Sequence, residues 1–94
     1  MKLNFEHIEG EKKGDVKLYA LSTCVWCGKT KELLAELGVE FDFIYVDLLN
    51  SDEKQCAIDE VKKYNESCSF PTLVINEDKV IVGFKEADIK EALS

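Results

Sequence analysis

A Cys-Val-Trp-Cys motif occupies residues 24–27, between an apolar run and a run with helical periodicity. The apolar run at 15–21 predicts a strand, and residues 28–37 repeat apolar side chains at helical spacing. The dithiol is therefore expected at a strand-to-helix turn. The first N–H groups of a helix lack partners and carry partial positive charge, so they stabilise a thiolate placed there. A redox-active cysteine pair is the leading hypothesis.

The length and charge of the chain limit its organisation and its partners. Its 94 residues suffice for one hydrophobic core but not for two, so we expect one domain over 1–94, with 1–14 as an N-terminal extension. A net charge of -7 argues against nonspecific binding to nucleic acid or to anionic membranes. No segment has the apolar length of a signal peptide or of a membrane span. These features predict a cytoplasmic protein, which we expect to be monomeric.

The rest of the chain divides into segments of strand and helix periodicity. In chain order we expect an edge strand within 2–9, a turn at 10–14 that closes a hairpin, a strand at 15–21, a helix at 27–37, a strand at 40–47, a helix at 51–65, a hairpin of 72–75 with 80–82, and a helix at 85–93. Cys27 lies seven residues before Leu34, which puts it on the inward face of the first helix.

This order predicts an α/β fold. The strand at 40–47 is apolar on both faces from Phe43 onward, as expected of a strand inside the sheet and parallel to the strand at 15–21. A helix joining two parallel strands crosses over with a right hand. The fold class is therefore a mixed sheet with helices on both faces.

The motif at 24–27, the segment Phe70-Pro71-Thr72 that opens the second hairpin, and the pair Gly83-Phe84 together resemble the glutaredoxins and glutaredoxin-like redoxins of the thioredoxin superfamily. The resemblance covers residues 15–93. It implies a thioredoxin fold, with four strands of a mixed sheet to which the N-terminal strand is added as an extra edge. It also implies a cis bond before Pro71, the one proline of the chain.

The resemblance assigns roles to the site residues. Cys24 is the nucleophile that attacks a target disulfide, and Cys27 is the resolving thiol that releases the reduced target. The chain is then an enzyme, a dithiol–disulfide oxidoreductase and electron carrier, with neither a cofactor nor a metal. The expected substrate-binding residues are Val25, Trp26, Phe70, Pro71, Gly83 and Phe84.

Two departures from the glutaredoxin pattern concern the reductant. Glutaredoxins that use glutathione usually carry Lys or Arg three residues before the first cysteine, where this chain has Leu21. They also carry Gly-Gly followed by Asp near the last helix, where this chain has Gly83-Phe84-Lys85. The chain is more similar to redoxins reduced by a thioredoxin reductase, a class that includes electron donors to ribonucleotide reductase. Lys85 still offers a charge, so glutathione use is weakened and not excluded.

Other uses of the cysteines compete with this interpretation. The first is an iron–sulfur cluster or metal carrier that uses Cys24, and the second is an interaction module with inert thiols. A four-cysteine zinc site is disfavoured because eleven residues separate Cys56 from Cys68. We expect Cys56 to be exposed on the polar side of its helix. Cys68 is expected on a loop facing the dithiol, as a small loop residue, and His7 is expected to be structural.

Overall fold

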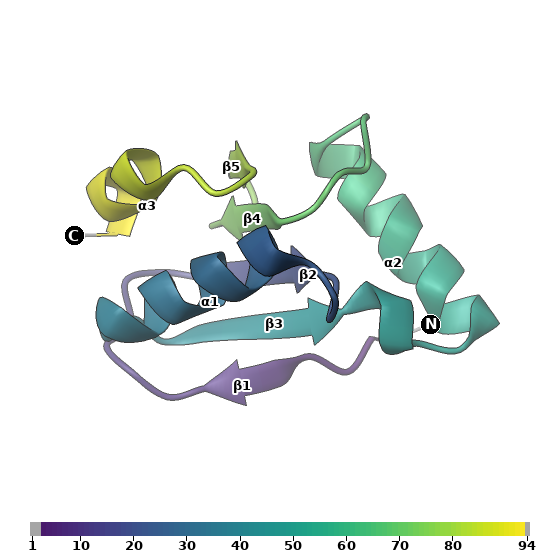
Figure 1. Cartoon of the computed structure of the whole chain (residues 1–94), viewed down its shortest axis with the longest axis horizontal. Coiled ribbons are helices and arrows are strands. Elements are labelled where there is room, and N and C mark those ends of the chain that lie inside the picture. Colours follow the sequence, from purple (N-terminus) through teal and green to yellow (C-terminus); the bar gives the residue numbers. More distant parts are fainter. Residues whose placement is uncertain (1–2, 94) are drawn as a thin grey trace.

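The computed structural model describes residues 3–93, so Lys2 and both ends of the expected domain lie outside the described range. Within it, helices cover both faces of a central sheet (Figure 1). The elements in chain order are β1 (Glu6–Ile8), β2 (Val16–Ala20), α1 (Val25–Glu36), β3 (Phe41–Tyr45), the 3-10 turn η1 (Val46–Leu48), α2 (Ser51–Tyr64), β4 (Thr72–Ile75), β5 (Lys79–Val82) and α3 (Glu86–Leu93). The expected α/β class is confirmed.

The sheet has five strands in the order β1-β3-β2-β4-β5. The middle strand, β2, runs parallel to β3, with Leu18 opposite Phe43, and antiparallel to β4, with Leu18 opposite Leu73. The expected parallel pair and the hairpin of β4 with β5 are both confirmed. Strand β3 lies inside the sheet, because β1 covers its other edge.

The expected N-terminal hairpin is wrong. Strand β1 pairs antiparallel with β3, and His7 lies opposite Asp42. Between β1 and β2 the chain runs beside the start of β3, where the Glu11 N–H donates to the Gly38 carbonyl at 2.7 Å and the Glu40 N–H donates to the Glu11 carbonyl at 2.9 Å. The physical reason is that β3 and β4 occupy both edges of β2, so β1 cannot pair with β2 and pairs instead with the outer edge of β3.

Each face of the sheet has its own apolar core. Helices α1 and α3 pack on one face, where Cys27, Leu34 and Ile89 are buried against the sheet. Helix α2 packs on the opposite face through Ala57 and Val61. Figure 1 shows α1 crossing β2 and β3 on the side toward the viewer. The helical periodicity thus correctly placed Cys27 on the inward face of α1.

Two element boundaries differ from the expected ones by two residues, for local reasons. Helix α1 begins at Val25, before the expected residue 27, because Cys24 caps it. Strand β3 ends at Tyr45, before the expected residue 47, because residues 46–48 turn into η1. Helix α2 begins at Ser51 as expected, with Asn50 as its cap. In residues 3–93, no helix combines the length and the apolar character that crossing a bilayer requires.

Candidate active site

Cys24 is the N-cap residue of α1. Its backbone is extended, with φ −89° and ψ 118°, and its Sγ accepts the N–H of Cys27 at 3.2 Å. A cap side chain normally supplies a hydroxyl, amide or carboxylate oxygen to one of the unpaired N–H groups at the helix start. Here a sulfur atom does so, and it lies where the positive end of the helix dipole favours negative charge. The Cys24 side chain is half-buried.

Cys27 differs from Cys24 in its surroundings. It is 1% exposed and belongs to the core between α1 and the sheet. Burial, followed by the hydrogen bond with the Cys24 thiol, raises the pKa of Cys27 to about 12, while the Leu21 N–H, which donates to its Sγ at 3.4 Å, lowers that pKa. Desolvation has a larger effect on this pKa than the Leu21 hydrogen bond, because burial penalises the charged form of the thiol. Cys27 is therefore protonated at neutral pH.

An uncharged groove of about 230 Å³ lies beside the motif, lined by Trp26, Phe70, Pro71, Gly83 and Phe84. The Phe70-Pro71 bond is cis, as expected. The rings of Trp26 and Phe84 stack with centroids 5.9 Å apart and planes inclined by 23°. Five of the six expected substrate-binding residues thus line one groove. The sixth, Val25, is 68% exposed and does not line it.

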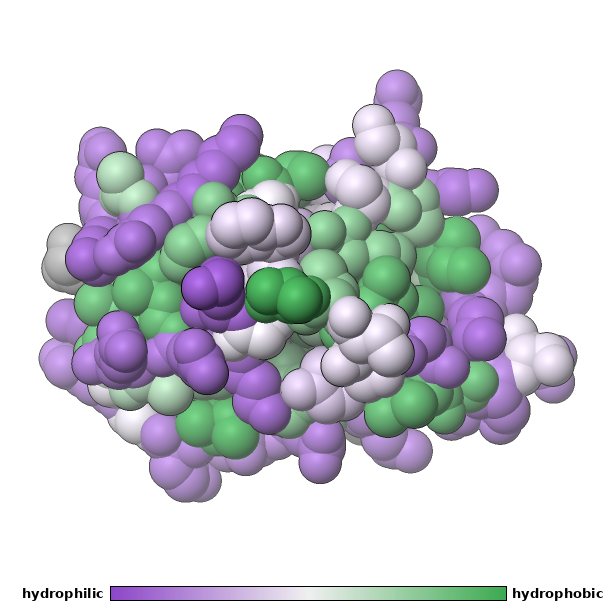
Figure 2. All heavy atoms as spheres, in the orientation of Figure 1, coloured by the Kyte–Doolittle hydropathy of each residue, from purple (hydrophilic) through white to green (hydrophobic). Residues whose placement is uncertain are grey.

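The groove lies between Trp26 on α1 and the loops that carry Phe70-Pro71 and Gly83-Phe84. Trp26 is 57% exposed, and the Lys29 Nζ lies 5.8 Å from the centroid of its ring. In the face drawn in Figure 2, apolar and near-neutral side chains meet near the middle, with hydrophilic residues around much of the rim. A large exposed aromatic ring with an apolar neighbour is a common feature of surfaces that bind other proteins.

The sequence analysis missed an interaction next to the dithiol. The Asp47 carboxylate accepts the Ser22 N–H at 2.8 Å and the Ser22 Oγ–H at 2.5 Å. These two hydrogen bonds are the main reason that the pKa of Asp47 is lowered. A signal was present in the sequence, because Asp47 ends a run expected to be parallel to the strand before the dithiol. Parallel strands bring their carboxyl ends to one edge of the sheet.

The expected exposure of Cys56 is wrong. Its side chain is half-buried at the border of the α2 core, because it precedes the fully buried Ala57. The Cys56 Sγ donates to Glu60 Oε2 at 3.9 Å, and Glu60 Oε1 accepts the buried Tyr19 hydroxyl at 2.9 Å. Cys56 therefore extends a polar contact between α2 and β2.

Cys68 lies on the loop before Pro71, as expected, but its side chain does not line the groove. The half-buried Cys68 packs against the core beneath α2, whereas Cys24 packs against the core beneath α1. Its backbone adopts φ 50°, and its N–H donates to the Asn65 carbonyl at 2.9 Å. Cys68 thus shapes the loop before Pro71 and does not line the groove.

His7 lies in a separate charged cluster at the edge of the sheet. Its Nδ1 is 2.5 Å from Asp42 Oδ1, and its Nε2 is 3.6 Å from Glu9 and 3.8 Å from Glu40. The hydrogen bond to Asp42 is the largest cause of the raised pKa of His7. Within residues 3–93, His7, Glu9 and Glu40 form the one set of three side chains close enough to share a metal ion. The cluster contains neither thiol of the motif.

The comparisons with known proteins agree with this geometry. A family model described as Glutaredoxin matches residues 16–80, from the start of β2 to within β5. The chain belongs to the glutaredoxin family. The match includes both cysteines of the motif and the cis-proline loop, and it leaves the N-terminal extension outside.

Relatives of this chain share between 33% and 54% of its sequence. A glutaredoxin-like 8.6 kDa protein of the rubredoxin operon of Clostridium pasteurianum is 33% identical over 79 residues, which cover 83% of this chain and 96% of that protein. Methanoredoxin from Methanosarcina acetivorans is 54% identical, with a TM-score of 0.89 over 90% of each chain. A glutaredoxin from Methanosarcina mazei Go1 is 53% identical, with a TM-score of 0.89 over 99% of this chain and 90% of that one. The structure has the thioredoxin-like fold of these neighbours.

Proposed function

We propose that this glutaredoxin is a dithiol oxidoreductase that carries electrons to protein disulfides in the cytoplasm, as a monomer. The observation that carries the proposal is the difference between the two thiols of one motif. Cys24 caps α1 and is half-buried, whereas Cys27 is 1% exposed and its pKa is raised to about 12. One thiol is accessible to a partner, while the other stays protonated until the first has reacted.

The reaction follows from this order. The Cys24 thiolate attacks one sulfur of the target disulfide, forms a mixed disulfide and releases the first target thiolate, which takes up a proton. Cys27 then loses its proton and attacks Cys24 Sγ, and the second target thiolate leaves and is protonated. The target gains two electrons and two protons. The motif loses them and is left oxidised, as the Cys24–Cys27 disulfide. A reductant must return two electrons and two protons to this disulfide before another cycle can start.

The groove supports a protein or peptide substrate. Its lining of three aromatic rings, one proline and one glycine carries no charge. Such a surface can bind the apolar side chains that flank a target cysteine. Val25 completes the contact surface as an exposed apolar side chain next to Cys24.

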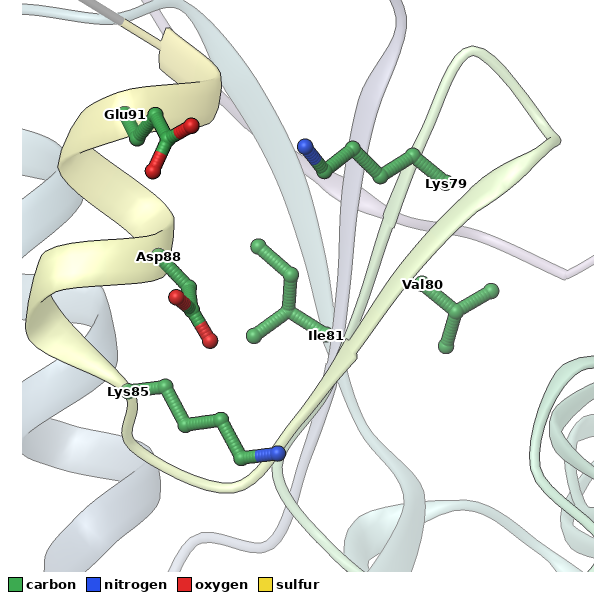
Figure 3. A pocket seen from close by; sticks show the side chains of 6 residues that line it. All are labelled: Lys79, Val80, Ile81, Lys85, Asp88 and Glu91. Carbon is green, nitrogen blue, oxygen red and sulfur yellow. The ribbon is translucent and has the colours of Figure 1, made fainter.

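We propose a thioredoxin reductase as the reductant, with glutathione as a poor substitute and ribonucleotide reductase as a candidate target. Glutathione has two carboxylates, and the groove residues offer them no cation. Leu21 is apolar and packs against the core. Lys85 lines a different hollow of about 260 Å³ between β5 and α3, together with Lys79, Asp88 and Glu91 (Figure 3). Each missing charge-assisted hydrogen bond weakens binding by about 1.5–3 kcal/mol.

A stoichiometric assay tests the proposed function. The reduced protein is mixed with an excess of a peptide that contains one disulfide, and the peptide thiols released are counted. We expect two thiols per chain and a Cys24–Cys27 disulfide in the product. The Cys24→Ser variant should release none, and the Cys68→Ser variant should match the wild type. Oxidised protein is then offered glutathione or thioredoxin reductase with NADPH.

The same preparation separates the alternative function. Protein purified without oxygen is examined for colour and for acid-labile sulfide, which an iron–sulfur carrier would show and a dithiol carrier would not. A coloured protein whose reduced form releases no peptide thiol would replace the oxidoreductase proposal with the carrier.

A further inference from the structure

We propose that Asp47 is a positioning residue for the dithiol, which acts through Ser22 to hold the turn between β2 and α1 and places a fixed negative charge behind Cys27. The inference rests on the proposed oxidoreductase function and adds a residue to its machinery. Asp47 lies outside the motif and outside the groove.

The topology brings Asp47 to the turn. Strands β2 and β3 are parallel neighbours, with Ala20 opposite Tyr45 at their carboxyl ends. Ser22 lies two residues beyond Ala20, and Asp47 lies two residues beyond Tyr45. Both carboxylate oxygens of Asp47 accept hydrogen bonds from this serine. Oδ1 accepts the Ser22 N–H at 2.8 Å, and Oδ2 accepts the Ser22 hydroxyl at 2.5 Å. A two-point contact fixes the position of Ser22 and also its orientation.

Ser22 is tied to both thiols through its neighbours in the turn. The Leu21 N–H donates to Cys27 Sγ at 3.4 Å, and the Leu21 carbonyl accepts the Cys24 N–H at 3.2 Å. A shift of Ser22 therefore moves Leu21. This displaces the N–H that donates to Cys27 Sγ and the carbonyl that holds the Cys24 backbone. The distance between reacting sulfurs decides the rate of the resolving step, because small misplacements lower such rates steeply.

The charge of Asp47 adds an electrostatic effect. The Ser22 hydrogen bonds lower the pKa of Asp47, and Lys54 on α2 lowers it further, so the carboxylate is ionised at neutral pH. The negative charge of Asp47 is one of the causes that raise the pKa of Cys27, after burial and the contact with Cys24. An anion near a thiol disfavours its thiolate. Asp47 thus helps to keep Cys27 protonated until Cys24 has formed the mixed disulfide.

Three substitutions separate the geometric effect from the electrostatic one. Asp47→Asn removes the charge and keeps an oxygen for the Ser22 N–H. Ser22→Ala keeps the charge and removes the hydroxyl contact. Asp47→Ala removes both. The matched control is Asp59→Asn, an exposed aspartate on α2 that makes no contact with the turn in residues 3–93.

Two measurements are made on each variant. The first is turnover with the disulfide peptide, in which we expect Asp47→Ala to lose roughly ten- to hundred-fold and Ser22→Ala to lose less. The second is the pH dependence of Cys27 alkylation in a Cys24→Ser background. We expect Cys27 to react at lower pH in Asp47→Asn and Asp47→Ala, and at the wild-type pH in Ser22→Ala and Asp59→Asn.

The outcomes distinguish this inference from the proposed function. If the wild type reduces no disulfide, the proposed function fails, yet the alkylation profile of Cys27 still tests Asp47. If the wild type is active, turnover of Asp47→Ala within about two-fold of wild type overturns the positioning role. An unchanged Cys27 profile in Asp47→Asn overturns the electrostatic role. Should Asp47→Ala fail to fold, Asp47→Asn and Ser22→Ala decide the result.

Discussion

The Cys27 N–H donates to Cys24 Sγ at 3.2 Å, so the accessible cysteine of the motif caps the helical turn that carries the buried one. The contact holds the Cys24 sulfur against the backbone of Cys27 before any substrate arrives. It also fixes their difference, because Cys24 is at the helix start and Cys27 is in the core. The predictions below follow from that asymmetry and from the surfaces around it.

The first prediction concerns thiol reactivity. Because burial raises the pKa of Cys27 to about 12, its thiol is protonated at pH 7. In a Cys56→Ser/Cys68→Ser background, one equivalent of iodoacetamide should therefore label Cys24 and leave Cys27 unmodified, as read by peptide mapping. Equal labelling of the two thiols near pH 6 would contradict the assigned division of labour.

The second prediction concerns the reductant. Leu21→Lys places a cation three residues before Cys24, where it can pair with a carboxylate of glutathione. A charge-assisted hydrogen bond of about 1.5–3 kcal/mol corresponds to roughly a 10- to 150-fold gain in affinity, so the KM for glutathione should fall. Leu21→Met, which adds no charge, is the control. If the wild type already turns over glutathione mixed disulfides as fast as glutathione-dependent glutaredoxins, the choice of reductase loses its support.

The third prediction concerns the aromatic groove. Trp26→Ala removes an exposed ring that lines the groove, and a contact between two aromatic rings, as with an aromatic side chain of the peptide, contributes about 0.5–1.5 kcal/mol beyond the area it buries. We expect the KM for the disulfide peptide to rise by roughly three- to ten-fold, with the alkylation of Cys24 unchanged. Leu48→Ala is the matched control, because Leu48 is 68% exposed and does not line the groove. Equal effects of the two substitutions would show that the groove binds no substrate.

The fourth prediction concerns pH and the N-terminal strand. The pKa of His7 is raised in the folded protein, above 6.5, chiefly by its hydrogen bond to Asp42. A raised folded pKa adds stability that is fully present below the unfolded value and is lost as pH rises through the folded value. His7→Gln should therefore lower the urea midpoint at pH 5.5 more than at pH 9. Glu6→Gln on the same strand is the control, and equal losses for His7→Gln at both pH values would refute the effect.

The dithiol and its setting could be predicted from the sequence because local rules determine them. Alternating and helical periodicity located β2 and α1, and the seven-residue offset from Leu34 correctly placed Cys27 in the core. The second hairpin and the helix expected at 85–93 were predicted equally well. Each of these features depends on residues within one element or on one short turn.

The features that sequence reasoning missed depend on pairing across the fold. Strand β1 was assigned to a hairpin with its sequence neighbour β2, although β3 and β4 take both edges of β2. No local pattern encodes which free edge of the sheet a strand joins. The contact of Asp47 with Ser22 joins residues 25 positions apart and needs the parallel register to be known. Cys56 was assigned to the exposed side of α2. It is half-buried because the apolar core beneath α2 extends past Ala57 and Val61 to include it, and the width of that core cannot be read from the helix sequence alone.

The most direct test of the central claim is to trap the mixed disulfide. Reduced Cys27→Ser protein is mixed with the disulfide peptide, and the product is analysed by intact mass and by peptide mapping. We expect one adduct of half the peptide, attached through Cys24 and released by dithiothreitol, because the resolving thiol is missing. An adduct on Cys56 or Cys68, or no adduct at all while the Cys24 thiol remains free, would contradict the account.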